Sequence, residues 1–185
     1  MPLPLALPFA LACGITLAWF ARIELARAEV PLLLTRPFLV ALGMGFLVIA
    51  PVLGYFAALH QDWAWLYLVR GSRIPSAIDL VVVVAMGSAV PVGFVVAAPW
   101  AIAKRGALVA RVTAVCVVFF LIGCALAARR LAVSATFAQF HGGFGALPTS
   151  KTVLGRGLLS SWITLGAGYG WSAWVLRPRR TSDRA

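Results

Sequence analysis

Long runs of uncharged, apolar residues are the feature that most restricts how this chain can fold. The runs approach the ~20 residues that an α-helix needs to cross ~30 Å of hydrocarbon. They belong to a chain of 185 residues of which 62% are hydrophobic and 11% charged, whereas soluble domains carry about 25% charged residues. A soluble fold of this size cannot hide so much apolar surface, so we expect lipid to solvate it.

The backbone narrows the fold class further. Every N–H and C=O group within the hydrocarbon needs an internal partner, which leaves either helices or a closed barrel. Barrel strands alternate apolar and polar residues, and these runs do not. The sequence therefore predicts an all-α fold, a polytopic transmembrane helix bundle.

About five spanning helices are predicted in one transmembrane domain, residues 1–176. The spans cover residues 2–21, 37–59, 78–103, 107–128 and 153–176, and a short basic cytoplasmic tail follows at 177–185. Thr35 is a predicted N-cap before Pro37, and Pro51 is expected to kink the second span. The uncharged stretch 131–150 is not a sixth span, because its glycines, histidine and proline would interrupt a helix in lipid.

Three short features complete the predicted topology. The first run has no basic residue before it, unlike a signal peptide, and is interpreted as a span. Lys104-Arg105-Gly106 is too short for anything but a tight turn between antiparallel helices. Arg129-Arg130 ends an apolar stretch without a turn residue, so the helix is expected to continue into residues 131–139.

The basic residues are interpreted as topology signals. The net charge is +11, but the Lys and Arg residues lie between or beside the apolar runs, which favours contacts to anionic lipid head groups over nucleic acid. With the N-terminus outside, ten of them lie in the cytoplasm and six outside. This excess predicts an N-terminus outside and a C-terminus in the cytoplasm. We expect the cell membrane, and specifically a bacterial inner membrane.

One set of residues suited to chemistry is predicted at the external face. Five spans place the second and fourth connections on one side, which would let His60, Asp62 and His141 converge. Two imidazoles and a carboxylate could bind a metal ion or act in general acid–base catalysis. The alternative is that they cap helices or meet head groups. Because their spacing matches no known motif, the sequence predicts neither a bound metal nor a cofactor.

Arginine residues flank the same predicted face. Arg70, Arg73, Arg129 and Arg130 are candidates for lipid head-group binding, because Arg binds phosphate through two parallel hydrogen bonds. The alternative is that these residues only anchor the ends of the spans.

Small residues recur at regular spacing in two spans. Such stripes let helix backbones approach closely. The residues are Ala85, Ala89 and Gly93 in the third span, and Ser160, Thr164 and Gly168 with the pair Gly166 and Gly170 in the fifth. The stripes serve packing within the bundle or form a face for a partner or a second copy.

The functional hypotheses follow from the uncharged middles of the predicted spans. Ion-coupled transporters retain ionisable residues there, and this chain has none. The leading hypothesis is a non-catalytic accessory or assembly component of a homo-oligomer or a larger membrane complex. One alternative is an external-face lipid- or metal-binding protein or enzyme that uses His60, Asp62 and His141. The other is a small permease for an uncharged solute.

Overall fold

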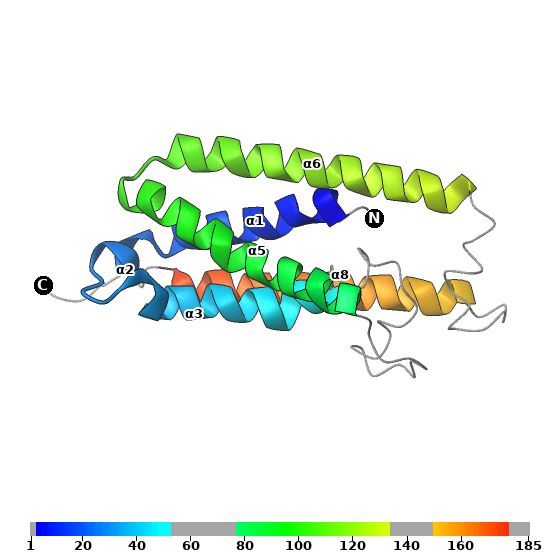
Figure 1. Cartoon of the computed structure of the whole chain (residues 1–185), viewed down its shortest axis with the longest axis horizontal. Helices are drawn as coiled ribbons and strands as arrows, with labels where there is room; N and C mark the ends of the chain where they lie inside the picture. The colour runs from blue at the N-terminus through cyan, green and yellow to red at the C-terminus, as the bar shows by residue number, and fades with distance from the viewer. Residues whose placement is uncertain (1–2, 53–76, 134–149, 178–185) are drawn as a thin grey trace, which may run out of the picture.

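The computed structural model describes residues 3–52, 77–133 and 150–177. Over these ranges the chain is almost entirely helical and contains no strand (Figure 1). Two of the described helices contain segments long and apolar enough to cross a membrane, Val84–Ile102 and Gly106–Gly123. The all-α fold class is therefore confirmed, whereas the number of crossings stays a prediction.

Five long helical segments overlap the five predicted spans. The first is α1, Leu3–Phe20, and the short elements α2, Arg22–Ala26, and η1, Leu32–Leu34, follow it. The second begins with α3, Arg36–Gly43, continues as a π-helix, η2, Met44–Ile49, and runs to Val52. The last three are α5, Ala77–Ile102, α6, Gly106–Val133, and α8, Ser150–Leu176.

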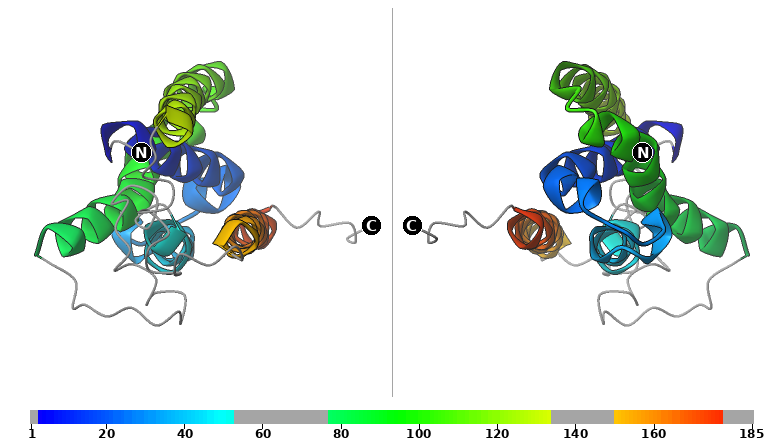
Figure 2. Two further views of the ribbon diagram at one scale, coloured as in Figure 1. Left: turned by 90° about the vertical axis from the view of Figure 1, so that its right-hand side faces the viewer. Right: turned by 90° about the vertical axis from the view of Figure 1, so that its left-hand side faces the viewer.

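The long helices run side by side and alternate in direction (Figure 1). Helix α1 makes its most extensive contacts with α5, and it also contacts α6 and α8. The π-helical segment η2 packs between α5 and α8. In the end-on views α6 and α8 lie on opposite sides of the molecule (Figure 2). Helix α6 is therefore held mainly by α1, whereas α8 packs against both η2 and α1.

The α1–α5 interface depends on two glycines. A Cβ atom at Gly14 of α1 would overlap the carbonyl oxygen of Val90, and one at Gly93 of α5 would overlap the carbonyl oxygen of Leu11. The backbones of α1 and α5 therefore touch at both of these glycines, because small residues let paired helices approach closely. Phe94 is fully buried beside them. Neither glycine has room for a side chain unless the helices separate.

A second glycine contact joins α5 to η2. A Cβ atom at Gly45 would overlap the carbonyl oxygen of Gly87. The π-helical segment lies immediately before Pro51, whose ring has no N–H to donate and clashes with the carbonyl four residues earlier. A wider turn at this point is a recognised way for a helix to accommodate such a residue. A π-helical segment thus precedes Pro51, whereas the predicted kink at Pro51 itself stays a prediction.

Two of the predicted local features are confirmed. The Thr35 hydroxyl accepts a hydrogen bond from the Phe38 amide at 3.4 Å and donates one to the Leu32 carbonyl at 2.7 Å, which caps α3. Helix α6 continues past Arg129 and Arg130 as far as Val133. The rest of that predicted extension lies outside the described residues.

The predicted tight turn between α5 and α6 is also present. Lys104 adopts a positive φ of 56°, a conformation that normally favours glycine. The Arg105 amide donates to the Trp100 carbonyl at 2.9 Å, which closes the C-terminus of α5. Gly106 has a different role, because a Cβ atom there would lie 2.8 Å from the ring of Trp19. The glycine of this turn is used for close packing against α1.

We expect Gly14→Ala to destabilise the bundle by roughly 1–3 kcal/mol, the usual cost of overpacking. Its methyl group would meet the Val90 backbone, so α1 and α5 would have to move apart. The measurement is the free energy of unfolding in mixed detergent micelles.

Gly43→Ala is the matched control for this substitution. A Cβ atom at Gly43 meets nothing within 4 Å, so the variant should gain about 0.5–1 kcal/mol from the higher helix propensity of alanine. If Gly14→Ala is as stable as the unmodified protein, the close α1–α5 contact is wrong.

Candidate functional site

Charged residues gather at one end of the bundle. This end contains α2, the start of α3, the α5–α6 turn and the end of α8 (Figure 1). Among the described residues, seven basic residues occupy this end, against the two acidic residues Glu24 and Glu29. The basic residues are Arg22, Arg27, Arg36, Lys104, Arg105, Arg111 and Arg177. We call it the basic end, and it is a surface that attracts anions.

Four tryptophans accompany the basic end. Trp19 and Trp100 are half-buried, while Trp171 and Trp174 are 61% and 70% exposed. The Arg22 guanidinium lies 4.6 Å from the centre of the Trp19 ring and donates to the Trp19 carbonyl at 2.9 Å. Tryptophan beside basic residues is typical of the level where a bilayer meets water. These four tryptophans were not among the predicted site residues, although their positions next to Arg and Lys residues could have identified them.

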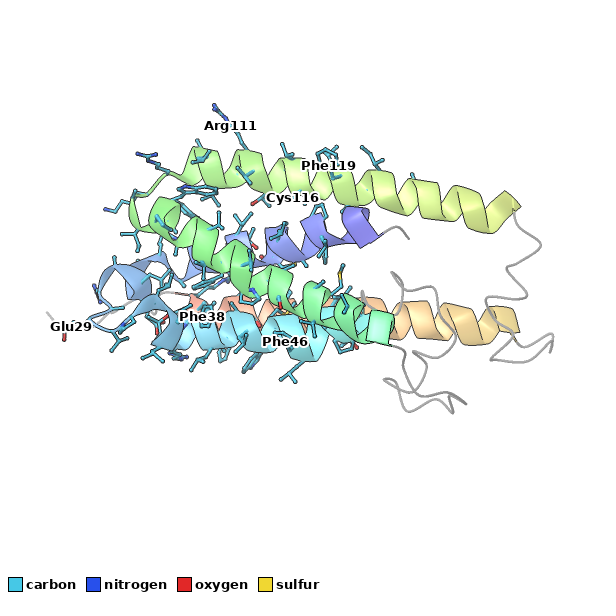
Figure 3. All side chains as sticks on the ribbon, viewed as in Figure 1. Glu29, Phe38, Phe46, Arg111, Cys116 and Phe119 are labelled. Atoms are coloured by element: carbon cyan, nitrogen blue, oxygen red, sulfur yellow. The ribbon has the colours of Figure 1, made fainter. Side chains whose placement is uncertain are left out.

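Uncharged helix lies between the two ends of the bundle. In the described chain no Asp, Glu, Lys, Arg or His occurs in residues 3–20, 37–52, 80–102, 112–128 or 157–176. The outer face of α6 carries exposed apolar side chains, and Phe119 points away from the bundle whereas Cys116 points toward it (Figure 3). The middle of the molecule therefore offers neighbouring molecules an apolar surface.

A polar contact joins α1 and α8 within this uncharged region. The Tyr169 hydroxyl donates to Thr16 Oγ1 at 2.6 Å. Thr16 Oγ1 in turn lies within hydrogen-bond distance of the Ala12 and Cys13 carbonyls, at 2.9 and 3.0 Å. Side-chain hydrogen bonds of this kind join helices in an apolar medium. The pair fixes the register of α8 against α1.

A cavity of about 310 Å³ adjoins this contact. Residues of α1, η2, α6 and α8 line it, and they are apolar except for Cys13, Thr16, Thr113 and Tyr169. Thr113 Oγ1 is buried and has no hydrogen-bond partner among the described residues. This oxygen has essentially no accessible surface, so it does not open into the cavity, whose walls are almost wholly apolar.

The residues predicted for chemistry or head-group binding are only partly described. His60, Asp62 and His141 lie outside the described residues, as do Arg70 and Arg73. Arg129 and Arg130 lie in the last part of α6, at the end of the bundle opposite the basic end (Figure 1). The convergence of the two histidines with Asp62 stays a prediction.

The residues predicted for helix packing occupy varied positions. Ala89 is buried and Ala85 half-buried on α5, close to the Gly93 contact with α1. On α8, a Cβ atom at Gly168 would lie 2.8 Å from the Val48 side chain. The other predicted positions on α8 are Ser160, Thr164, Gly166 and Gly170, of which the last three are exposed. Added Cβ atoms at Gly166 and Gly170 would meet nothing within 4 Å.

Among the residues that the structure describes, no group of three or more His, Cys, Asp or Glu side chains could hold a metal ion. No protein-family model, curated protein or solved structure matches this chain. The basic end, the apolar outer surface and the cavity are therefore the features of the described chain that bear on its function.

A double-mutant cycle between Tyr169→Phe and Thr16→Ala tests the contact between α1 and α8. We expect a coupling energy of about 0.5–1.5 kcal/mol, the range for hydrogen bonds between membrane helices. The measurement is the free energy of unfolding of the two single variants and the double variant. Additive effects, with no coupling, would show that the two hydroxyl groups do not interact.

Proposed function

We propose that the chain crosses a bilayer five times and serves as a non-catalytic accessory or assembly component of a membrane complex. The observation that carries the proposal is the poor coverage of α6. Only 17% of its apolar segment Gly106–Gly123 is buried in the fold, compared with 56% of Val84–Ile102 in α5. Contact with acyl chains or with the helices of a partner costs this apolar surface no free energy, whereas contact with water is unfavourable.

The distribution of charge supports five crossings. Each of the five long helical segments contains an uncharged stretch bounded by charged residues near one or both ends. Buried ionisable groups are costly in hydrocarbon, whereas Lys and Arg at helix ends reach the head groups. The two outer stretches, on α6 and α8, also carry exposed apolar residues such as Phe119 and Ile163.

The basic end supports the orientation. Positively charged connections remain in the cytoplasm, and the basic end collects the α5–α6 turn and the C-terminal end of α8 (Figure 1). Helix α1 begins at the opposite end (Figure 1). We therefore propose that the N-terminus lies outside and the C-terminus in the cytoplasm of a cell membrane, with the tryptophans of the basic end at the inner head-group level.

The outer face of α6 supports an assembly role. Its exposed residues include Val115, Val118, Phe119, Leu121 and Ile122, and they form an uncharged surface on one side of the bundle. A partner helix could pack along this face with the dispersion contacts that join helices in lipid. The hypothesis of an external site at His60, Asp62 and His141 concerns residues outside the described chain.

Single-cysteine labelling tests the topology. In a variant without the native cysteines, Glu29→Cys, Lys104→Cys and Arg177→Cys should react with a membrane-impermeant maleimide only in inside-out vesicles. Lys151→Cys, at the start of α8, should react only in right-side-out vesicles. The readout is the mass of the labelled protein.

The four positions act as controls for one another, since each orientation of the vesicles labels a different set. Labelling of Glu29→Cys and Arg177→Cys from opposite sides of the membrane would contradict the proposed arrangement of the basic end.

Mass measurement after mild detergent extraction tests the assembly role. The unmodified chain, of 19.7 kDa, should run within a larger complex of defined mass. Val118→Trp adds bulk to the outer face of α6 and should reduce the recovered complex at least tenfold, because closely packed helices do not tolerate overpacking.

Leu47→Trp is the matched control. Leu47 lies on η2 and is 78% exposed, so the same bulk placed there should leave the complex intact. Recovery of the unmodified protein as a single chain under every mild extraction condition would contradict the assembly role.

A further inference from the structure

We propose that the basic end binds the phosphodiester head group of an anionic phospholipid where α2 meets the α5–α6 turn. The site consists of Arg22, Lys104 and Arg105 around the ring of Trp19, and we call it the head-group site. It rests on the proposed membrane location and is independent of the assembly role. The convergence of the cations, their lack of acidic partners and the apolar surface beside them support it separately.

The Trp19 ring brings the cations of two segments together. On α2, the Arg22 guanidinium lies 4.6 Å from the centre of this ring. At the start of α6, a Cβ atom added to Gly106 would lie 2.8 Å from the same ring. Helix α2 also packs against α5. Arg22 is therefore a neighbour of the α5–α6 turn in space, although the two are far apart in the sequence.

The three cations are positioned to meet a ligand from water. Backbone hydrogen bonds at 2.9 Å fix the turn, from the Arg105 amide to the Trp100 carbonyl and from the Gly106 amide to the Lys104 carbonyl. The side chains of Lys104 and Arg105 are exposed. The Arg22 guanidinium donates one hydrogen bond, to the Trp19 carbonyl. Its other N–H groups are available to form the paired hydrogen bonds with which Arg binds phosphate.

The charge of the head-group site favours an anionic lipid over a zwitterionic one. Within the described ranges, no ion pair joins its three cations to Glu24 or Glu29. Residues two apart on a helix do not face one another, which keeps the Glu24 carboxylate from Arg22. An anionic head group would neutralise the excess positive charge. A zwitterionic head group would bring a further cation into the cluster.

Apolar surface beside the head-group site favours a lipid over a soluble anion. Ile23 follows Arg22 and is 39% exposed, and Ile102 closely precedes the turn and is 45% exposed. The poorly buried apolar segment Gly106–Gly123 begins at the same turn. A lipid with its phosphate at the site would therefore have its acyl chains beside apolar side chains. The half-buried Trp19 and Trp100 belong at this head-group level.

Native mass spectrometry of the full chain, released from detergent micelles, measures the binding of single lipid molecules. Phosphatidylglycerol has one phosphodiester and no amine, and we expect it to bind at least tenfold more tightly than phosphatidylcholine. Arg22→Gln and Arg105→Gln should each weaken phosphatidylglycerol binding about tenfold, the effect of one hydrogen bond to a charged group. The exposed Arg105 side chain has no partner in the described chain, so Arg105→Gln should fold normally, as its thermal unfolding in detergent will show.

Two further variants separate a local site from general attraction. Arg177→Gln removes the same charge from the basic end, but Arg177 directly follows α8, which lies on the opposite side of the molecule from α6 (Figure 2). Its affinity for phosphatidylglycerol should stay within twofold of the unmodified chain, and an equal loss would mean that total charge alone binds the lipid. Arg22→Lys keeps the charge without the planar fork and should still lose affinity about fivefold. Full affinity in Arg22→Lys would contradict the paired hydrogen bonds.

Three other results would overturn the head-group site. Equal affinity for phosphatidylglycerol and phosphatidylcholine, in a chain that inserts into liposomes, would remove the anionic preference and leave the membrane location intact. Unchanged affinity in both Arg22→Gln and Arg105→Gln would place the bound lipid elsewhere. Equally tight binding of glycerophosphoglycerol, the same head group without acyl chains, would show that a soluble phosphodiester takes the site. A chain that stays in solution when mixed with liposomes would instead contradict the proposed membrane location.

Discussion

The medium that surrounds the apolar outer surface is the constraint on which the rest of the structure depends. Helix α6 presents valine, leucine, isoleucine and phenylalanine to its surroundings along the segment Gly106–Gly123, most of which is not buried by the rest of the bundle. In water this surface would drive aggregation, because apolar area is costly to hydrate. In hydrocarbon the same surface is already in a favourable medium. The bundle then requires interactions that hold its helices to one another.

These interactions are the close approach of the helix backbones and a few polar contacts. In lipid the burial of apolar side chains gives little preference for protein over acyl chains, so dispersion between tightly fitted helices has to suffice. Gly14 and Gly93 provide this fit between α1 and α5, and Gly45 provides it between η2 and α5. The Thr16–Tyr169 hydrogen bond adds a directional contact to α8. Helix α6 has fewer such contacts, and most of its segment Gly106–Gly123 stays available for lipid or for a partner.

The sequence predicted the features that depend on local chemistry. The helical fold class, the Thr35 cap and the tight turn at Lys104 follow from hydrophobicity, capping preference and loop length, and all three are present. The continuation of α6 past Arg129 followed from the absence of a turn residue. Each of these properties is decided within a few residues along the chain.

Contacts between helices could not be predicted in the same way. The predicted stripe in α5 included Gly93. Gly87 of α5 and Gly45 of η2, which contact one another, stand out by no periodicity in the sequence. Their contact depends on where the two helices cross in space. The Thr16–Tyr169 contact joins residues 153 positions apart. The cavity is lined by residues of four elements that are far apart in the sequence. The predicted external cluster of His60, Asp62 and His141 involves similar long-range convergence, and those residues lie outside the described chain.

We propose that acyl chains, and not water, surround the apolar outer surface of the bundle wherever no partner covers it. A spin label at Leu47, which is 78% exposed on η2 and lies outside the proposed partner face, is compared in liposomes with one at Lys104. Collision rates with oxygen, which concentrates in hydrocarbon, and with a water-soluble nickel complex measure the surroundings of each label directly. We expect high oxygen and low nickel accessibility at Leu47 and the reverse at Lys104. Equal, high accessibility of both positions to the nickel complex would contradict this proposal.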